Sequence, residues 1–282
     1  MPIQSVKHFL RSGIRAMPPR DPHQMHRVST PLELLFDLVV VIAIAAAAAE
    51  LHHALAHAHV LAGICKFMLA FFAIWWAWMN YSWFVSAYDN DDALFRLLTM
   101  LVMAGALTIA SGIQQFFQHN KLNFIVIGFV MMRIAMVLFW LRATKHHPAL
   151  KGTTLTYAAG IFLVQMYWLA LLGAQPLTPG ALYGLFALGA ALELSVPALA
   201  ERQGMTPWHH HHMMERYGLL NIIVLGETLL ASMMAIRSLA DTTQVALPLL
   251  QLPLLAIVLL FCLWWLYFSR EEHLQQIGRA HV

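Results

Sequence analysis

Long apolar runs, separated by short polar connections, dominate the chain. Eight of these runs are close to the roughly 20 residues that a helix needs to cross a bilayer. The predicted spans are residues 32–51, 60–84, 95–115, 122–142, 154–173, 181–199, 214–236 and 247–268. Turn and start signals such as Pro148, Thr178-Pro179-Gly180 and Thr206-Pro207 fall in the connections. The pattern predicts an all-α fold, a polytopic bundle of transmembrane helices over residues 30–276 that follows a basic tail of residues 1–29.

Basic residues gather on one side of the predicted spans. If the N-terminus is cytoplasmic, most Lys and Arg residues fall in the tail and in the cytoplasmic connections, whereas the outer side receives only Lys66, Lys121 and Arg237. Arg133 lies inside the fourth span. Cytoplasmic loops carry an excess of Lys and Arg, so we expect a cytoplasmic N-terminus.

Composition supports a membrane protein and limits its partners. The chain is 60% hydrophobic and 11% charged, whereas soluble domains carry roughly 25% charged residues. The net charge of +3 comes mostly from residues at the ends of segments and does not indicate nucleic-acid binding. Cys65 and Cys262 both lie in apolar runs, so neither a disulfide framework nor a zinc ribbon is indicated. We expect a lipid bilayer as partner, no nucleic acid and no cofactor.

The first span opens with two acidic residues. Thr30-Pro31-Leu32-Glu33 has the pattern of a capping box, with Pro31 at the first helical position. Asp37 lies one turn deeper on the same face, where capping no longer explains a carboxylate. An ion pair with a neighbouring helix and a place on an ion or substrate path both remain open.

A second acidic group, Asp89, Asp91 and Asp92, precedes the third span. Carboxylates are ligands that hard cations prefer, but the group lacks the further spacing of a calcium loop. An acidic helix start that is favoured by the helix dipole and paired with Arg96 is the preferred interpretation.

Two more carboxylates lie inside later spans. Glu193 in the sixth span must find a partner or stay protonated. Glu227 in the seventh span follows Gly226, a small residue that allows another helix to approach closely. A neutral, proton-exchanging carboxyl is the expectation for Glu227.

Four consecutive histidines precede the seventh span, whose helix we expect to start at Pro207. A cluster of His209, His212 and Glu215 could ligate zinc. A histidine-rich cytoplasmic loop is the simpler interpretation, because four adjacent histidines cannot all point one way. Arg216 lies at about the depth of Glu33 and Asp37, and we expect it to be their counter-ion.

These polar residues suggest a shared cavity. The predicted topology places them on or near the cytoplasmic half, with Glu227 near the midplane. We therefore predict a polar vestibule that is open to the cytoplasm and ends at Glu227. The predicted transport cluster is Glu33, Asp37, Glu193, Glu215, Arg216 and Glu227, and the secondary cluster is Asp89, Asp91, Asp92 and Arg96. Caps and structural ion pairs are the alternative explanation.

Several of these stretches together resemble the bacterial low temperature requirement protein A family. The matching motifs are TPLELLFDLV at residues 30–39, WWAW at 75–78, YDNDD at 88–92, Glu193-Leu194, HMMERYG at 212–218 and IIVLGE at 222–227. The resemblance implies a multi-pass protein of the bacterial inner membrane. Members of the family are generally longer, and residues 277–282 match what one reading frame of a common sequencing-library adapter encodes, so we expect this tail to be non-native.

Three functions are compatible with these features. The leading one is a secondary transporter for an unknown small solute or ion, in which Glu227 is the proton-linked carboxyl and Asp37, Glu215 and Arg216 form a gate or relay. The second is an intramembrane metal-dependent enzyme that uses His209, His212 and Glu215. The third is a non-catalytic envelope-stress or membrane-organising protein. We expect a protein that is not an enzyme.

Overall fold

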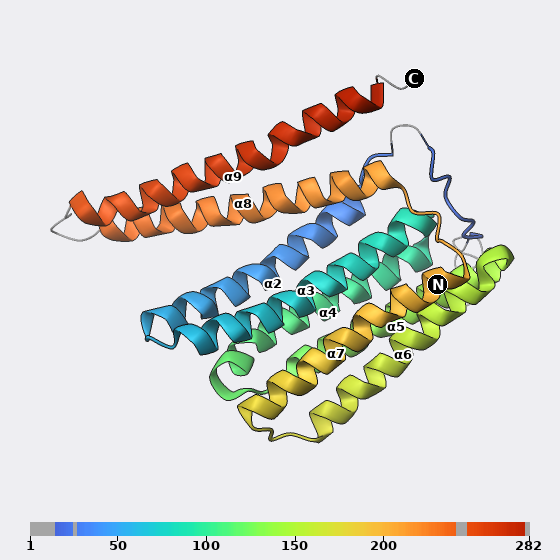
Figure 1. The fold of residues 1–282 in the computed structure, drawn as a ribbon, viewed down its shortest axis with the longest axis horizontal. Coiled ribbons are helices and arrows are strands. Elements are labelled where there is room, and N and C mark those ends of the chain that lie inside the picture. The colour runs from blue at the N-terminus through green and yellow to red at the C-terminus, as the bar shows by residue number, and fades with distance from the viewer. Residues whose placement is uncertain (1–14, 25–26, 241–246, 280–282) are drawn as a thin grey trace, which may run out of the picture. The chain divides into compact units, whose positions relative to one another are not determined.

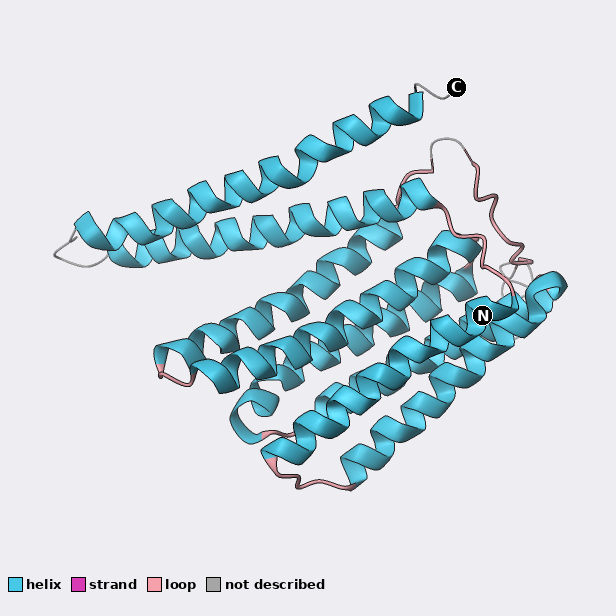
Figure 2. Cartoon of the chain, viewed as in Figure 1, coloured by secondary structure: helices cyan, strands magenta, loops and turns pink. Residues whose placement is uncertain are grey.

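The fold is helical throughout the described residues. The computed structural model describes residues 15–24, 27–240 and 247–279, and Figures 1 and 2 show helices joined by short connections. The α-helices are α2 (Pro31–Ala56), α3 (Val60–Tyr88), α4 (Ala93–His119), α5 (Asn123–His146), α6 (Lys151–Gly173), α7 (Pro179–Ala200), α8 (His210–Ala240) and α9 (Leu247–Arg279). Two short 3-10 turns, Pro148–Leu150 and Glu201–Gln203, precede α6 and follow α7. The predicted all-α bundle is confirmed.

Seven helices in the described part of the chain are long and apolar enough to cross a membrane. They correspond to the first seven predicted spans. The eighth predicted span lies within α9, in which the described apolar stretch, Pro253–Ser269, is shorter. Of the predicted tail of residues 1–29, residues 1–14, 25 and 26 lie outside the described residues, as do residues 280–282 of the predicted adapter-derived end.

The chain divides into two compact units, Met1–Met214 and Glu215–Val282. In the first unit α2 packs against α3 and α4, α4 against α5, α5 against α6, and α6 against α7. Figure 1 shows these six helices running alongside one another. The second unit contains most of α8 and all of α9.

Local capping sets the helix starts. Thr30 accepts a hydrogen bond from the Glu33 amide while the Glu33 side chain accepts one from the Thr30 amide, so the predicted capping box is confirmed. Asp92 caps α4 and Thr178 caps α7 in the same way through their side chains. At the end of α4, Asn120 adopts the left-handed conformation (φ 55°) that often ends a helix.

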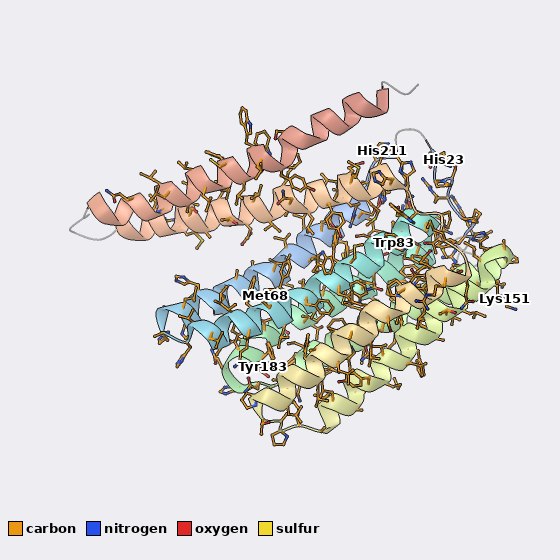
Figure 3. The ribbon with its side chains drawn as sticks, in the orientation of Figure 1. His23, Met68, Trp83, Lys151, Tyr183 and His211 are labelled. Carbon is orange, nitrogen blue, oxygen red and sulfur yellow. The ribbon has the colours of Figure 1, made fainter. Side chains whose placement is uncertain are left out.

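Hydrogen bonds join the segments at one end of the first unit. The Arg20 amide donates to the Ala87 carbonyl at 2.9 Å. The Trp83 indole donates to the Thr206 hydroxyl at 3.1 Å, and its ring lies 4.7 Å from that of Trp208. Figure 3 labels Trp83 near the end of α3. The N-terminal segment and the connection before α8 therefore both contact the last turns of α3, at the end of the unit where we expect the cytoplasm.

Two glycines allow α4 and α5 to approach closely. A Cβ added at Gly128 would lie 2.5 Å from the carbonyl oxygen of Gly105, and one added at Gly105 would lie 2.6 Å from that of Gly128. Backbone atoms cannot rotate away as a flexible side chain can, so a methyl group here would push the two helices apart.

We expect Gly128→Ala to lower the free energy of unfolding by about 1–3 kcal/mol, the usual cost of overpacking. Thermal unfolding of the purified protein in detergent would measure it. Gly184→Ala in α7 is the matched control, because a Cβ there would meet nothing within 4 Å. Equal melting temperatures for Gly128→Ala and the wild type would show that the α4–α5 contact is not this tight.

Candidate functional site

Two tryptophans of α3 hold carboxylates from two other helices. The Trp78 indole donates to Asp37 Oδ1 in α2 at 2.6 Å, and the Trp76 indole donates to Glu193 Oε2 in α7 at 2.9 Å. Residues two apart on a helix point about 200° apart. Asp37 and Glu193 are therefore bound on different faces of α3, and these two members of the predicted transport cluster are held apart.

Glu193 forms a buried ion pair with Arg133 of α5. The Arg133 guanidinium lies 2.7 Å from Glu193 Oε1, and each side chain is 3% exposed. The Trp168 indole of α6 donates to the same oxygen at 3.1 Å. The Arg133 guanidinium also lies 5.4 Å from the centre of the Phe129 ring, within cation–π range. The predicted need of Glu193 for a partner is thus met by a cation and two indoles from three other helices.

A narrow aromatic pocket lies beside this ion pair. Its walls include Phe72, Trp76, Phe129, Trp168 and Phe186, with Glu193 at one side. Its volume of about 10 Å³ has room for about one water molecule. In this conformation the pocket does not admit a solute.

Glu33 forms a second buried pair, with His212 in the first turn of α8. Its Oε2 atom lies 2.9 Å from His212 Nε2, and the side chains are 1% and 0% exposed. Its Oε1 atom accepts from the amide and the hydroxyl of Thr30, both at 3.1 Å. Capping therefore explains only one of the two carboxylate oxygens. The other links the start of α2 to the start of α8.

His209 is bound to main-chain groups through both ring nitrogens. Its Nε2 atom lies 2.7 Å from the Gln24 carbonyl, and its Nδ1 atom accepts from the His212 amide at 3.1 Å. A carbonyl only accepts, so the ring is protonated on Nε2. The His209 amide donates to Ser86 Oγ at 2.9 Å.

The proposed zinc ligands His209 and His212 thus contact other groups, His209 the Gln24 carbonyl and the His212 amide, and His212 the Glu33 carboxylate. No group of three or more His, Cys, Asp or Glu in the described part of the chain is arranged to hold a metal ion. The helix also begins at His210 rather than at the expected Pro207, so His209 lies before the first turn and contacts the N-terminal segment instead.

The three aspartates before α4 have separate roles. Asp91 pairs with Arg96 through two hydrogen bonds of 2.8 and 2.7 Å, and both side chains are at least half exposed. Asp92 forms a buried ion pair with Arg142 of α5 and also caps α4 through the Phe95 amide at 2.8 Å. The predicted acidic helix start paired with Arg96 is confirmed, through Asp91.

Their surroundings also separate the pKa values of these aspartates. Burial raises the pKa of Asp89, and the nearby charge of Glu33 adds to this. Burial acts in the same direction on Asp92, but hydrogen bonds from Arg142 and from the Phe95 and Arg15 amides outweigh it, and the net pKa is lowered. The hydrogen bond from Arg96 lowers the pKa of Asp91. Asp89 is thus the most readily protonated of the three.

The remaining predicted site residues lie in the second unit. Glu215, Arg216 and Glu227 all belong to α8, and the Glu227 side chain is exposed. A Cβ added at Gly226 would meet nothing within 4 Å. The vestibule that would join these residues to Glu33 and Asp37, with Arg216 as counter-ion, stays a prediction.

The partners of the buried acids were not among the residues predicted from the sequence. Arg133, Trp76, Trp78 and Trp168 are the main ones, and Arg142 is the partner of Asp92. Arg133 carried a usable signal, because an arginine at the centre of a span costs about 2.5–3.5 kcal/mol and needs compensation. The tryptophans carried none, since their clusters are also typical of a membrane interface.

We expect Arg133→Met and Glu193→Gln each to lower the free energy of unfolding by about 3–5 kcal/mol, because each leaves a buried charge without its partner. The double variant should lose less than the sum of the two. Unfolding in mixed micelles would measure all three, with Arg96→Met and Asp91→Asn as the exposed control pair, for which each loss should be far smaller because solvent screens the interaction. Strictly additive losses for Arg133 and Glu193 would contradict a coupled pair.

A second prediction concerns the pH dependence of the Asp92–Arg142 pair. The folded-state pKa of Asp92 is lowered from 3.8, so the unfolded state binds more protons below that pH, and stability rises with pH there. The contribution of the pair is fully present above about pH 3.8 and is lost as the pH falls through the folded-state pKa. Asp92→Asn should melt at a lower temperature than the wild type at pH 7, and the difference should shrink towards pH 3. A difference independent of pH would contradict this role.

Residues 28–281 match the family described as bacterial low temperature requirement A protein (LtrA). The uncharacterized protein RA0937 of Rhizobium meliloti (strain 1021) is 28% identical to the chain over 244 residues, which cover 84% of this chain and 57% of that protein. The chain thus spans somewhat more than half the length of this relative. No solved structure matches the chain. Because the family match runs through nearly all of the helices described above, this chain, a multi-pass membrane protein, belongs to the bacterial low temperature requirement A family.

Proposed function

We propose that the chain is a proton- or ion-coupled secondary transporter of the bacterial inner membrane. The buried Glu33–His212 pair is the observation that carries the proposal. Ionisable residues within membrane spans are costly and commonly mark ion pathways or proton relays. Glu33 Oε2 and His212 Nε2 lie 2.9 Å apart and both side chains are almost wholly buried, a separation within the reach that proton exchange between a carboxylate and an imidazole requires.

The nature of the cation separates this pair from the other buried pairs. Arg133 and Arg142 stay charged under all physiological conditions because a guanidinium does not deprotonate. An imidazole, unlike a guanidinium, can give up a proton. The Glu33–His212 pair therefore contains an exchangeable proton, which the two arginine pairs do not.

A second acid on α2 extends the proposed proton path from the helix start towards the membrane interior. Asp37 lies one helical turn further along α2, and the Trp78 indole holds one of its oxygens. A turn of helix rises about 5.4 Å, so Glu33 and Asp37 place two acids along one face, from the helix start inwards. On α8, in the second unit, Glu227 is the proposed proton-linked carboxyl, with Glu215 and Arg216 as members of the gate or relay.

We assign the Arg133–Glu193 pair the role of holding helices together and not a role in proton transfer. It joins α5 to α7, and the indoles of Trp76 and Trp168 join α3 and α6 to the same carboxylate. Since the adjacent pocket has room for only about one water, a solute path requires these helices to move.

We expect solute-driven proton movement in proteoliposomes that contain the protein and an internal pH-sensitive dye. Metal cations, organic cations, amino acids, organic acids and sugars would be added in turn, with the membrane potential clamped by valinomycin and potassium. At least one class should change the internal pH. Glu33→Gln and His212→Gln should lower the initial rate by at least about tenfold, because a positioned proton-transfer group is worth about that or more.

Two features make this experiment specific. Gln is accepted at the third position of a capping box, so Glu33→Gln removes the charge but keeps the cap with Thr30. Asp91→Asn, in the exposed pair with Arg96, is the matched control and should keep the wild-type rate. Wild-type protein that moves no protons with any solute class, or unchanged rates in both test variants, would show that the proposal is wrong.

A further inference from the structure

A polar cavity lies at the other end of the first unit, around the turn between α2 and α3. Its volume is about 350 Å³, within the range of small-molecule sites. The chemistry-bearing side chains in its wall are Glu50, His53, His57, His59, Lys66 and Gln118. Figure 1 shows this end, where a short turn joins α2 to α3.

The sequence places the polar side chains on one face of α2. Glu50, His53 and His57 are spaced i, i+3 and i+7, so they follow one stripe of the helix. Next to His53 on α2 is Ala54, and a Cβ added at Gly63 of α3 would lie 2.7 Å from the Ala54 Cβ. The two helices are therefore in close contact at Gly63, where no side chain intervenes, and the polar stripe lines the cavity beside this contact.

Lys66 brings a cation to the wall from α3. Its Nζ atom donates to the Phe117 carbonyl at 2.6 Å, in the last turn of α4, where helix carbonyls lack partners within the helix. An ammonium group has three donors, so this contact holds the cation in place and leaves donors for a ligand.

Two histidines add hydrogen-bonding ring nitrogens to the wall of the cavity. The rings of His53 and His57 stack with their centres 4.3 Å apart. The Nδ1 atom of His57 lies 2.9 Å from the His53 carbonyl, so Nδ1 is the protonated nitrogen and Nε2 is left to accept, or to donate once protonated. As no group of three metal ligands is formed among the described residues, a metal ion is not the ligand that the geometry favours.

We propose that this cavity binds a phosphoethanolamine group, that is, a phosphate ester that carries a primary ammonium. Lys66 and the imidazoles are donors for the phosphate, and the Glu50 carboxylate is the acceptor for the ammonium. The cavity offers one fixed acid and one fixed base, which matches a zwitterion rather than a simple anion. This site is separate from the Glu33–His212 pair and does not depend on transport.

Because of its position, we propose that the cavity takes this group from a lipid headgroup. It lies at the ends of apolar helices, where headgroups are found. Large apolar side chains next to its lining residues in the chain, Leu55, Val60 and Leu61, are 43%, 49% and 76% exposed. They provide a surface for acyl chains beside a polar cavity.

Calorimetric titration of the full chain in detergent would test the proposal with three probes. These are a short-chain phosphatidylethanolamine, the phosphatidylglycerol with the same acyl chains, and free phosphoethanolamine. We expect the ethanolamine lipid to bind more tightly than the glycerol lipid. Binding of free phosphoethanolamine with similar affinity would identify the soluble ester as the source, whereas binding of the lipid alone would identify the membrane.

Two substitutions with a control complete the test. Lys66→Met should weaken binding of all probes at least about tenfold, whereas Lys121→Met, an exposed lysine at the same end that does not line the cavity, should not. Glu50→Gln, which leaves the Lys66 contact with α4 intact, should equalise the two lipids while binding of phosphatidylglycerol is kept. The proposal is overturned if no probe binds the wild type, or if Glu50→Gln keeps the wild-type preference for ethanolamine.

Discussion

Hydrocarbon cannot solvate a charge, and the first unit meets this constraint by giving its buried ions partners from other helices. The clearest case is Glu193, which pairs with Arg133 of α5 and accepts hydrogen bonds from indoles of α3 and α6. Four helices are thereby fixed in rotation around one carboxylate. Replacing a buried ion pair by well-packed apolar residues is often neutral or stabilising, so the value of this pair is in specificity rather than in net stability. We infer that it selects one arrangement of α3, α5, α6 and α7 among the many that apolar surfaces alone would tolerate.

Polar contacts of another kind join the segments at the end of the unit that we expect to face the cytoplasm. There the Arg27 guanidinium donates to the carbonyls of Val85 and Ser86, at the end of α3. His209 accepts and donates between the N-terminal segment and the start of α8, and Arg142 joins Asp92 to the Arg15 carbonyl. Arg27 thereby satisfies carbonyls that the end of α3 leaves unpaired, and His209 and Arg142 bind carbonyls of the N-terminal segment. The excess of basic residues at this end is the basis for the expected orientation of the chain in the membrane.

Features that depend on residues close together in the sequence could be predicted, whereas contacts between residues far apart in the sequence could not. The spans and the caps depend on neighbouring residues, so hydropathy found the helices, and the Thr30–Glu33 pattern found the capping box. The partners of buried acids depend on how helices pack, and Trp76 and Glu193 are 117 positions apart. The sequence showed that Glu193 needed a partner or a proton and that Arg133 lies inside a span, but not that each is the partner of the other. It also suggested one shared cavity for Asp37 and Glu193, because depth is readable from a span while the face of α3 that each acid contacts is not. In the histidine run, identical side chains gave no indication of which ring would meet Glu33 and which would meet Gln24.

The two carboxylate oxygens of Glu33 have different partners, so a proton transfer at one oxygen can leave the helix cap at the other in place. Its Oε1 atom caps α2 through Thr30, while Oε2 faces His212. Transfer of a proton from His212 to Oε2 would replace the charge pair by a neutral hydrogen bond and would leave the cap acceptor in place. Arg133 and Arg142 hold their helices throughout such a cycle, because a guanidinium keeps its proton at every physiological pH. Of the three buried pairs, the one with an exchangeable proton thus lies at the starts of α2 and α8, and the two guanidinium pairs keep their helices in register. A coupled transporter needs this separation, since a proton that altered the Arg133–Glu193 pair would loosen four helices at once, whereas one that alters Glu33–His212 acts on the contact between the starts of α2 and α8.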